Sequence, residues 1–278
     1  MNERSLLPHW RLGSLSGMPS SPVSASLFYD RLSKVYDRLY PSWDETIIVQ
    51  AAALSRLIED HSGTQGGEVL DCACGIGTQA LGLAARGYDV TGIDISRKAV
   101  ARARQEARRR KLWSARFEIA DMRELPVRFQ DAFDVVICCD NPFAHLLSAG
   151  EVRIAFLAMR TALRSGGLLL VSTQDYSELL TNRPREVAFR HSEHGRQTTI
   201  VFQIWDWDSE EPVYVNNQFV LRQRIFGWKM HQATTRMRAY MMEEIGEEAE
   251  LAGFTDVRWR GLEESGFFQP ILSAMSPS

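Results

Sequence analysis

The apolar residues near the start of the chain recur with the period of a helix. From Phe28 to Tyr40, aromatic and aliphatic side chains are spaced at three and four positions, which predicts an amphipathic helix that ends before Pro41. A second helix is predicted from Trp43 to Ile58. The preceding residues are rich in Ser, Gly and Pro, so we expect a disordered tail over 1–26 and a helical unit over 27–60.

Residues 61–175 alternate between short apolar strands and amphipathic helices. This alternation predicts a parallel sheet that carries helices on both faces. Ser96 before one helix and Gly87 after another are typical helix boundaries. The predicted strands are 68–72, 88–94, 116–119, 133–139 and 167–173, and the predicted helices between them are 78–86, 97–111 and 151–163.

Beyond this core the apolar residues recur with a period of two. Between Glu186 and Tyr240 this alternation, broken by turn residues, predicts an antiparallel meander of about four strands. A helix over 241–252 and strands over 255–260 and 267–274 then return the chain to the first sheet. We therefore predict an α/β fold whose core, 61–175, is completed by 241–278. The β insertion, 176–240, follows the fifth strand and lies above the carboxyl ends of the parallel strands.

Composition narrows the class of function. The chain has 278 residues, of which 45% are hydrophobic, and its net charge of -3 lacks the basic excess of a nucleic-acid-binding protein. It has no stretch of 18 apolar residues and no leader-like apolar segment, so we expect a cytoplasmic protein without a membrane partner. The oligomeric state stays open, including a homo-oligomer. No metal is expected, because neither zinc-site nor disulfide spacing is found for Cys72, Cys74, Cys138 and Cys139.

A strand, a glycine turn and a helix open the predicted core. Gly75 and Gly77 allow a sharp turn and the close approach of a ligand, and Asp94 at the end of the next strand can accept hydrogen bonds from two ribose hydroxyls. Dinucleotide-binding proteins use the same spacing. The carboxylate of Asp71, four residues before the first glycine, repels a pyrophosphate. It favours a cofactor that carries an ammonium group, such as S-adenosylmethionine (SAM).

Two later strand ends extend this site and carry a family resemblance. After the third strand, Asp121 is a candidate to bind the exocyclic amine of adenine, and Met122 to contact its ring. The segment from Val69 to Ser96 resembles motifs I and II of class I SAM-dependent methyltransferases, and Val136 to Leu146 resembles the glycine and sarcosine N-methyltransferase group. This resemblance implies a Rossmann-like sheet of seven strands, the last one antiparallel, and a β insertion that covers the acceptor site.

The resemblance also implies roles for individual residues, with the N-terminal tyrosines as an aromatic lid. The implied cofactor-binding residues are Tyr36, Tyr40, Asp71, Ala73, Gly75, Gly77, Thr78, Asp94, Ile95, Asp121, Met122, Cys139 and His145. The candidate substrate-binding residues are Asn141, Gln174, Tyr176 and Trp205. The candidate catalytic residues are His145, Asp140 and Tyr29.

One position departs from the resembling group. Where the group has an Arg that pairs with a substrate carboxylate, this chain has Gln174, which cannot form a charged bidentate pair. We therefore expect SAM-dependent N-methylation of a small amine, or C-methylation of an electron-rich, indole-like ring, in specialised metabolism. A glycine or sarcosine N-methyltransferase remains an alternative if another arginine, such as Arg222 or Arg236, supplies the charge. An NAD-dependent oxidoreductase and a non-catalytic SAM-binding module are alternatives of other classes.

Overall fold

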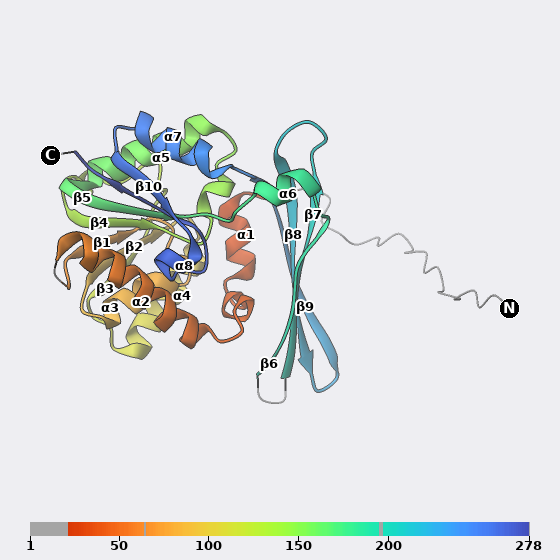
Figure 1. Ribbon diagram of the computed structural model, residues 1–278. Helices are drawn as coiled ribbons and strands as arrows, with labels where there is room; N and C mark the ends of the chain where they lie inside the picture. Colours follow the sequence, from red (N-terminus) through yellow and green to blue (C-terminus); the bar gives the residue numbers. More distant parts are fainter. Residues whose placement is uncertain (1–21, 64, 195–196, 278) are drawn as a thin grey trace.

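The chain forms two sheets that stand side by side. The computed structural model describes residues 22–63, 65–194 and 197–277. The larger sheet has seven strands in the order β10-β11-β5-β4-β1-β2-β3, and the smaller has four in the order β6-β7-β8-β9. Helix α1 (Ala25–Leu32) lies between the two sheets (Figure 1).

The larger sheet is the predicted Rossmann-like core. Its first five strands are parallel to one another: β1 (Glu68–Asp71), β2 (Asp89–Asp94), β3 (Ala115–Ile119), β4 (Phe133–Cys138) and β5 (Leu163–Ser172). The last strand, β11 (Ile271–Met275), runs antiparallel to both β5 and β10 (Thr255–Arg260), as expected. Because β1, β2 and β4 are parallel, their carboxyl ends at Asp71, Asp94 and Cys138 meet at one edge of the sheet, where ligands bind in such folds.

Helices cover both faces of the larger sheet. One face carries α2 (Trp43–Ser62), α3 (Thr78–Ala85) and α4 (Arg97–Arg110), and the other carries α5 (Ala149–Ala162) and α7 (Met242–Leu251). Short helical segments connect the elements: α6 (Ser177–Asn182), α8 (Leu262–Ser265), and the 3-10 turns η1 (Tyr36–Leu39), η2 (Val127–Phe129) and η3 (Pro142–His145).

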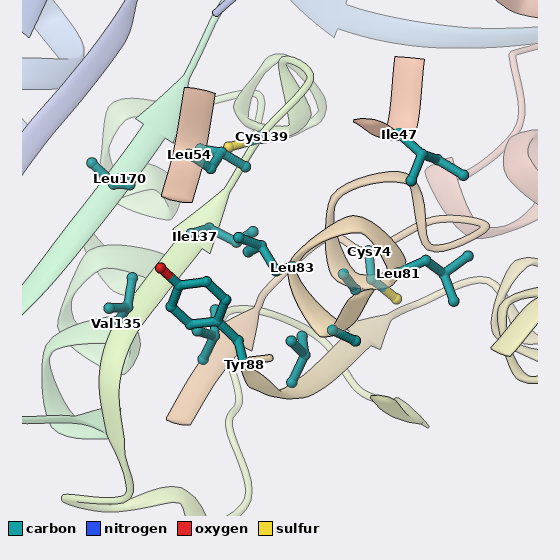
Figure 2. Packing of buried hydrophobic residues seen from close by; sticks show 14 of the residues in the cluster. Ile47, Leu54, Cys74, Leu81, Leu83, Tyr88, Val135, Ile137, Cys139 and Leu170 are labelled. Atoms are coloured by element: carbon teal, nitrogen blue, oxygen red, sulfur yellow. The ribbon is translucent and has the colours of Figure 1, made fainter. Parts of the chain in front are cut away.

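Close contact between α2 and α3 builds the core on the first of these faces. Figure 2 shows Leu54 of α2, Leu83 of α3 and Ile137 of β4 among the side chains of this cluster. A Cβ atom at Gly82 would lie 2.5 Å from the Cβ of Ala51, so only glycine permits this approach. The resulting cluster packs α3 against α2, beside the glycine turn that precedes α3.

The smaller sheet is the predicted insertion. Its four strands are antiparallel: β6 (Glu186–His194), β7 (Gln197–Trp207), β8 (Val213–Arg224) and β9 (Gly227–Arg238). Phe28 and Leu32 of α1 pack with Val201, Val220 and Ala233 on its inner face. The N-terminal segment therefore joins the insertion to the core.

Two boundaries near the N-terminus differ from the predictions. The predicted tail over 1–26 extends too far, because Val23 pairs with Thr235 of β9 and the Ser24 hydroxyl caps α1 by accepting a hydrogen bond from the Leu27 amide; residues 1–21 lie outside the described residues. The single helix predicted up to Tyr40 is also wrong. The α-helix ends at Leu32 because the Ser33 carbonyl accepts a hydrogen bond from Arg102 of α4, and η1 follows.

One predicted strand near the C-terminus is also too long. The strand expected over 267–274 begins only at Ile271, because α8 and a turn through Gly266, with a φ of 65°, come first. Ser265 and Phe267 are buried in this turn, which places Phe268 and Gln269 near the edge of the sheet where the strand ends meet.

Candidate active site

The glycine turn after β1 forms the floor of a narrow cleft. Gly77 has a φ of 94°, and a Cβ atom there would lie 3.0 Å from Leu81, so a larger residue is excluded. A Cβ atom at Gly75 would meet nothing within 4 Å, since this residue borders the cleft. The main chain can thus come close to a ligand at Gly75.

The cleft, with a volume of about 100 Å³, brings together most of the predicted cofactor residues. Asp71 and Gly77 lie behind the turn and do not line it. The predicted residues that do line it are Tyr29, Tyr36, Tyr40, Ala73, Gly75, Thr78, Asp94, Ile95, Asp121, Met122, Cys139, Asp140 and His145.

Asp94 is held in place for hydrogen bonding. Its Oδ2 accepts a hydrogen bond from the Gly75 amide at 3.0 Å, and its Oδ1 accepts one from the Ser96 amide at 2.7 Å. Burial raises the pKa of the Asp94 carboxyl to about 6. The two amides fix both oxygens, and their remaining lone pairs suit a ligand with two neighbouring hydroxyls.

Asp71 is a buried carboxylate that lacks a cationic partner. Its Oδ1 accepts a hydrogen bond from the Ala73 amide at 3.3 Å, whereas Oδ2 has no hydrogen-bond partner among the described residues. Burial raises the pKa of Asp71 to about 7. Such a group is costly while it is ionised, so a positive charge in the adjoining cleft would stabilise it, whereas a pyrophosphate there would be repelled.

Asp121 forms a pair with Arg123, which was not among the predicted site residues. Its Oδ1 accepts hydrogen bonds from the main-chain N and Nε of Arg123 at 2.9 and 3.0 Å, and Oδ2 accepts one from Nη2 at 2.7 Å. Burial alone would raise the pKa of Asp121, but the hydrogen bonds from Arg123 outweigh burial and lower it. Arg123 lines the cleft and orients this carboxylate beside Met122.

The candidate catalytic residues form two hydrogen-bonded pairs. The Tyr29 hydroxyl lies 2.9 Å from Nε2 of His145, and the Tyr40 hydroxyl donates to Oδ2 of Asp140 at 2.8 Å. Burial lowers the pKa of His145 to about 4, so its imidazole is neutral at pH 7. Burial raises the pKa of Asp140 to about 6. Nδ1 of His145 has no partner among the described residues, which leaves it free for a ligand.

The main chain is held in an unusual conformation at the end of β4. Asp140 and Asn141 have φ values of 73° and 64°, in the left-handed region that residues with side chains rarely adopt. The Asn141 amide stabilises this turn, because it donates to the Tyr176 hydroxyl at 2.7 Å and accepts from the Thr173 hydroxyl at 2.9 Å. Backbone strain of this kind is often found at functional sites.

A second cavity, of about 570 Å³, adjoins the cleft and extends under the smaller sheet. Both cavities are lined by the candidate catalytic residues and by two further tyrosines, so a molecule in one would meet a molecule in the other there. The residues common to both are Tyr29, Tyr36, Tyr40, Asp140 and His145.

The predicted substrate residues occupy different places around this second cavity. Asn141, Gln174 and Trp205 line it, whereas Tyr176 lies behind its wall and hydrogen-bonds the Tyr214 hydroxyl at 2.8 Å. Trp205 stacks on Tyr214 with ring centroids 4.1 Å apart. The geometry thus gives Tyr176 the position of a supporting residue.

Several lining residues were not anticipated. Glu45 of α2, Arg190 of β6 and Asn216 of β8 line the second cavity, and Oδ1 of Asn216 is buried without a partner among the described residues. Asn216 lies on the same face of its strand as Tyr214, so strand alternation is the signal that could have identified it. Arg190 follows a register shift in β6, which makes its face unpredictable from the sequence.

Two features are absent from the residues that the structure describes, 22–63, 65–194 and 197–277. No helix there is long and apolar enough to cross a membrane. The His, Cys, Asp and Glu side chains of those ranges form no group of three or more that could hold a metal ion.

Known proteins similar to this chain match the segment that forms the cleft. A family described as "Methyltransferase domain" matches residues 69–167. The chain is 32% identical over 147 residues to a glycine N-methyltransferase from Homo sapiens, covering 47% of each chain. It is 30% identical to a glycine/sarcosine N-methyltransferase from Aphanothece halophytica, covering 50% of this chain and 53% of that protein. The match thus spans about half the length of these relatives.

A solved structure extends the likeness to both sheets. The sugar N-methyltransferase KedS8 from Streptoalloteichus sp. superposes with a TM-score of 0.71 at 18% identity, covering 98% of this chain and 100% of that one. At this identity the likeness concerns the fold alone. The seven-stranded sheet, the glycine turn, Asp94 and the unpartnered Asp71 fit SAM as the cofactor, and residues 69–167 are similar to a methyltransferase domain.

Proposed function

We propose that this protein methylates the amino group of a small, polar acceptor. The observation that carries the proposal is the junction of the two cavities, where Tyr29, Asp140 and His145 border both the cofactor cleft and the larger cavity. When bound, SAM supplies an already activated methyl group. The protein therefore has to orient the acceptor nitrogen and remove one proton.

In this proposal Asp140 accepts the proton and His145 positions the nitrogen. The Asp140 carboxyl, with a pKa of about 6, is largely ionised at pH 7 yet can still take up a proton. His145 is neutral, and Tyr29 fixes its ring through Nε2, so Nδ1 is left for the acceptor. The amine enters uncharged, gains the methyl group, and loses one N–H proton to Asp140 and then to water.

The acceptor cavity favours a hydroxylated amine over an amino acid. Its wall presents uncharged amides, including Gln174 and Asn216, and the buried Oδ1 of Asn216 awaits a donor such as a hydroxyl. The fold of the sugar N-methyltransferase supports this class of acceptor, and the glycine N-methyltransferase relatives support methylation of an amine in general. Glycine and sarcosine remain the alternative acceptors. Arg190, which lines the cavity, is the cation that would pair with their carboxylate.

A flat aromatic acceptor is the second candidate. The stacked pair of Trp205 and Tyr214 lines the cavity and offers a surface for an indole-like ring. C-methylation of such a ring would use Asp140 to withdraw the ring N–H proton.

A panel of acceptors tests both candidates. Methyl 4-amino-4-deoxyglucoside, glycine, sarcosine, tryptamine and indole are incubated with methyl-labelled SAM, with wild type and with Asp140→Asn. We expect the amino glycoside to be methylated best and the variant to be at least 10-fold slower. Best turnover of glycine or sarcosine would contradict the proposal, and best turnover of indole would favour the second candidate. Calorimetric binding of NAD instead of SAM would exclude methyl transfer.

A further inference from the structure

The inner face of the smaller sheet carries a cluster of basic side chains just beyond the acceptor cavity. Arg190 lines the cavity and is paired with Val201, which also lines it. On β8, Val220 is the partner of Val201. Arg222 lies two positions beyond Val220 on the same face and is paired with Lys229 of β9. Paired residues of antiparallel strands project to the same side, so these cations continue the cavity wall toward the β8–β9 turn.

The cluster also includes a residue from the N-terminal segment. Burial lowers the pKa of Arg222, and so does repulsion from Arg38 of η1 and from Arg224. The carboxylate of Asp37 acts in the opposite direction on the pKa of Arg222, but it already pairs with Arg38 at 3.1 Å and with Arg102 at 2.9 Å. The basic rim, defined as Arg38, Arg190, Arg222 and Lys229, thus lies between η1 and the smaller sheet.

Of the four rim residues, Arg38 is paired with a carboxylate, that of Asp37. In the described part of the chain, no ion pair within 4 Å joins Arg190, Arg222 or Lys229 to an acidic side chain, whereas Arg185 and Arg238 of the same sheet are paired. Burial and repulsion from Lys229, Arg222 and Arg224 also lower the pKa of His231, which lies on the same face. Like charges held together in this way destabilise the protein unless an anion joins them.

We infer that the basic rim binds a phosphoryl group carried by the acceptor, while its amine lies at the junction of the two cavities. The inference rests on the proposed function and names the acceptor class more closely: an amine with a phosphate or diphosphate substituent. Several separated cations match the dispersed charge of a phosphoryl group, whereas a carboxylate needs only one arginine in a bidentate pair. Arg190 belongs to both the cavity wall and the rim, and so links the two ends of the acceptor.

Binding of inorganic pyrophosphate tests the rim without any methylation. The protein is first saturated with S-adenosylhomocysteine, so that the glycine turn is occupied, and is then titrated calorimetrically with pyrophosphate at fixed ionic strength. The double variant Arg222→Gln/Lys229→Gln should bind at least 10-fold more weakly than wild type. Arg236→Gln is the matched control, because this exposed arginine lies on the outer face of β9. Equal weakening in both variants, or no binding to wild type, would overturn the inference.

A matched pair of acceptors separates this inference from the proposed function. Glucosamine 6-phosphate should displace pyrophosphate and should have a KM at least 10-fold below that of glucosamine, and the double variant should remove that difference. Displacement of pyrophosphate by glycine or sarcosine at equal concentration would overturn the phosphoryl assignment. Rim-dependent pyrophosphate binding without methylation of any amine would support the rim and contradict the proposed function.

Discussion

Two main-chain amides fix the carboxylate of Asp94, so this side chain contributes to binding only through the ligand that it meets there. We predict that Asp94→Ala weakens S-adenosylhomocysteine binding by about 10- to 100-fold, because hydrogen bonds to a charged group contribute roughly 1.5–3 kcal/mol. Calorimetry measures the change. Asp89→Ala, at the exposed start of the same strand, is the control and should bind as wild type does. Equal affinity in all three proteins would remove Asp94 from the site.

Asp71 leads to a prediction about stability and pH. Its folded-state pKa of about 7 lies above the ordinary value of 3.8, so the folded protein holds a proton there that the unfolded chain releases. Its contribution to stability is therefore fully present below about pH 4 and lost as the pH rises through 7. Asp71→Asn should raise the melting temperature of the cofactor-free protein more at pH 8 than at pH 5, by roughly 2–4 °C for each kcal/mol gained.

Thermal unfolding at the two pH values, with and without SAM, measures this effect. The same variant should lose SAM affinity, since the amide cannot balance the charge of an ammonium group. If the difference in melting temperature between wild type and Asp71→Asn is independent of pH, or grows toward pH 5, then the ionised Asp71 carboxylate does not destabilise the folded protein.

Among the elements, the N-terminal segment is the one whose removal we expect to open the cleft. It supplies Tyr29, Tyr36 and Tyr40 to both cavities. We predict that deletion of residues 1–42 lowers SAM affinity and activity at least 10-fold. Deletion of residues 1–21 leaves every described contact in place and should leave the melting temperature unchanged. Binding assays and thermal unfolding of the two truncated proteins test this, and full activity of the shorter protein would exclude a lid role for the tyrosines.

The elements also show what the sequence could predict. Alternating strands and helices predicted a parallel sheet covered by helices, and the resemblance to the methyltransferases implied its seven strands. The start of the last strand, predicted at 267, was wrong because α8 and the turn at Gly266 come before Ile271. The break after Leu32 could not be predicted, since the apolar period continues across it and the cause, a hydrogen bond from Arg102 to the Ser33 carbonyl, comes from 69 positions away. The cofactor residues lay in contiguous motifs, whereas the acceptor cavity combines residues such as Glu45 and Arg190 from segments far apart in the sequence.

At the scale of the whole molecule, a small apolar cluster joins α1 to the smaller sheet. Leu32 of α1 is 1% exposed and packs with Val201 and Val220 of the smaller sheet, so Leu32→Ala should cost about 2–5 kcal/mol. Loss of this contact should detach the insertion from α1 and lower kcat/KM for the acceptor at least 10-fold, with a smaller effect on S-adenosylhomocysteine affinity.

The matched control for this change lies on the same helix. Leu27 is 43% exposed, so Leu27→Ala removes a side chain of equal size without leaving a cavity and should change the melting temperature little. Limited proteolysis should then cut the β6–β9 segment of the Leu32 variant sooner than that of the Leu27 variant, while the seven-stranded core persists. If both variants melt and are cleaved alike, the cluster does not join the two sheets, and the acceptor cavity must be held together by the contacts of Tyr176, Trp205 and Tyr214 instead.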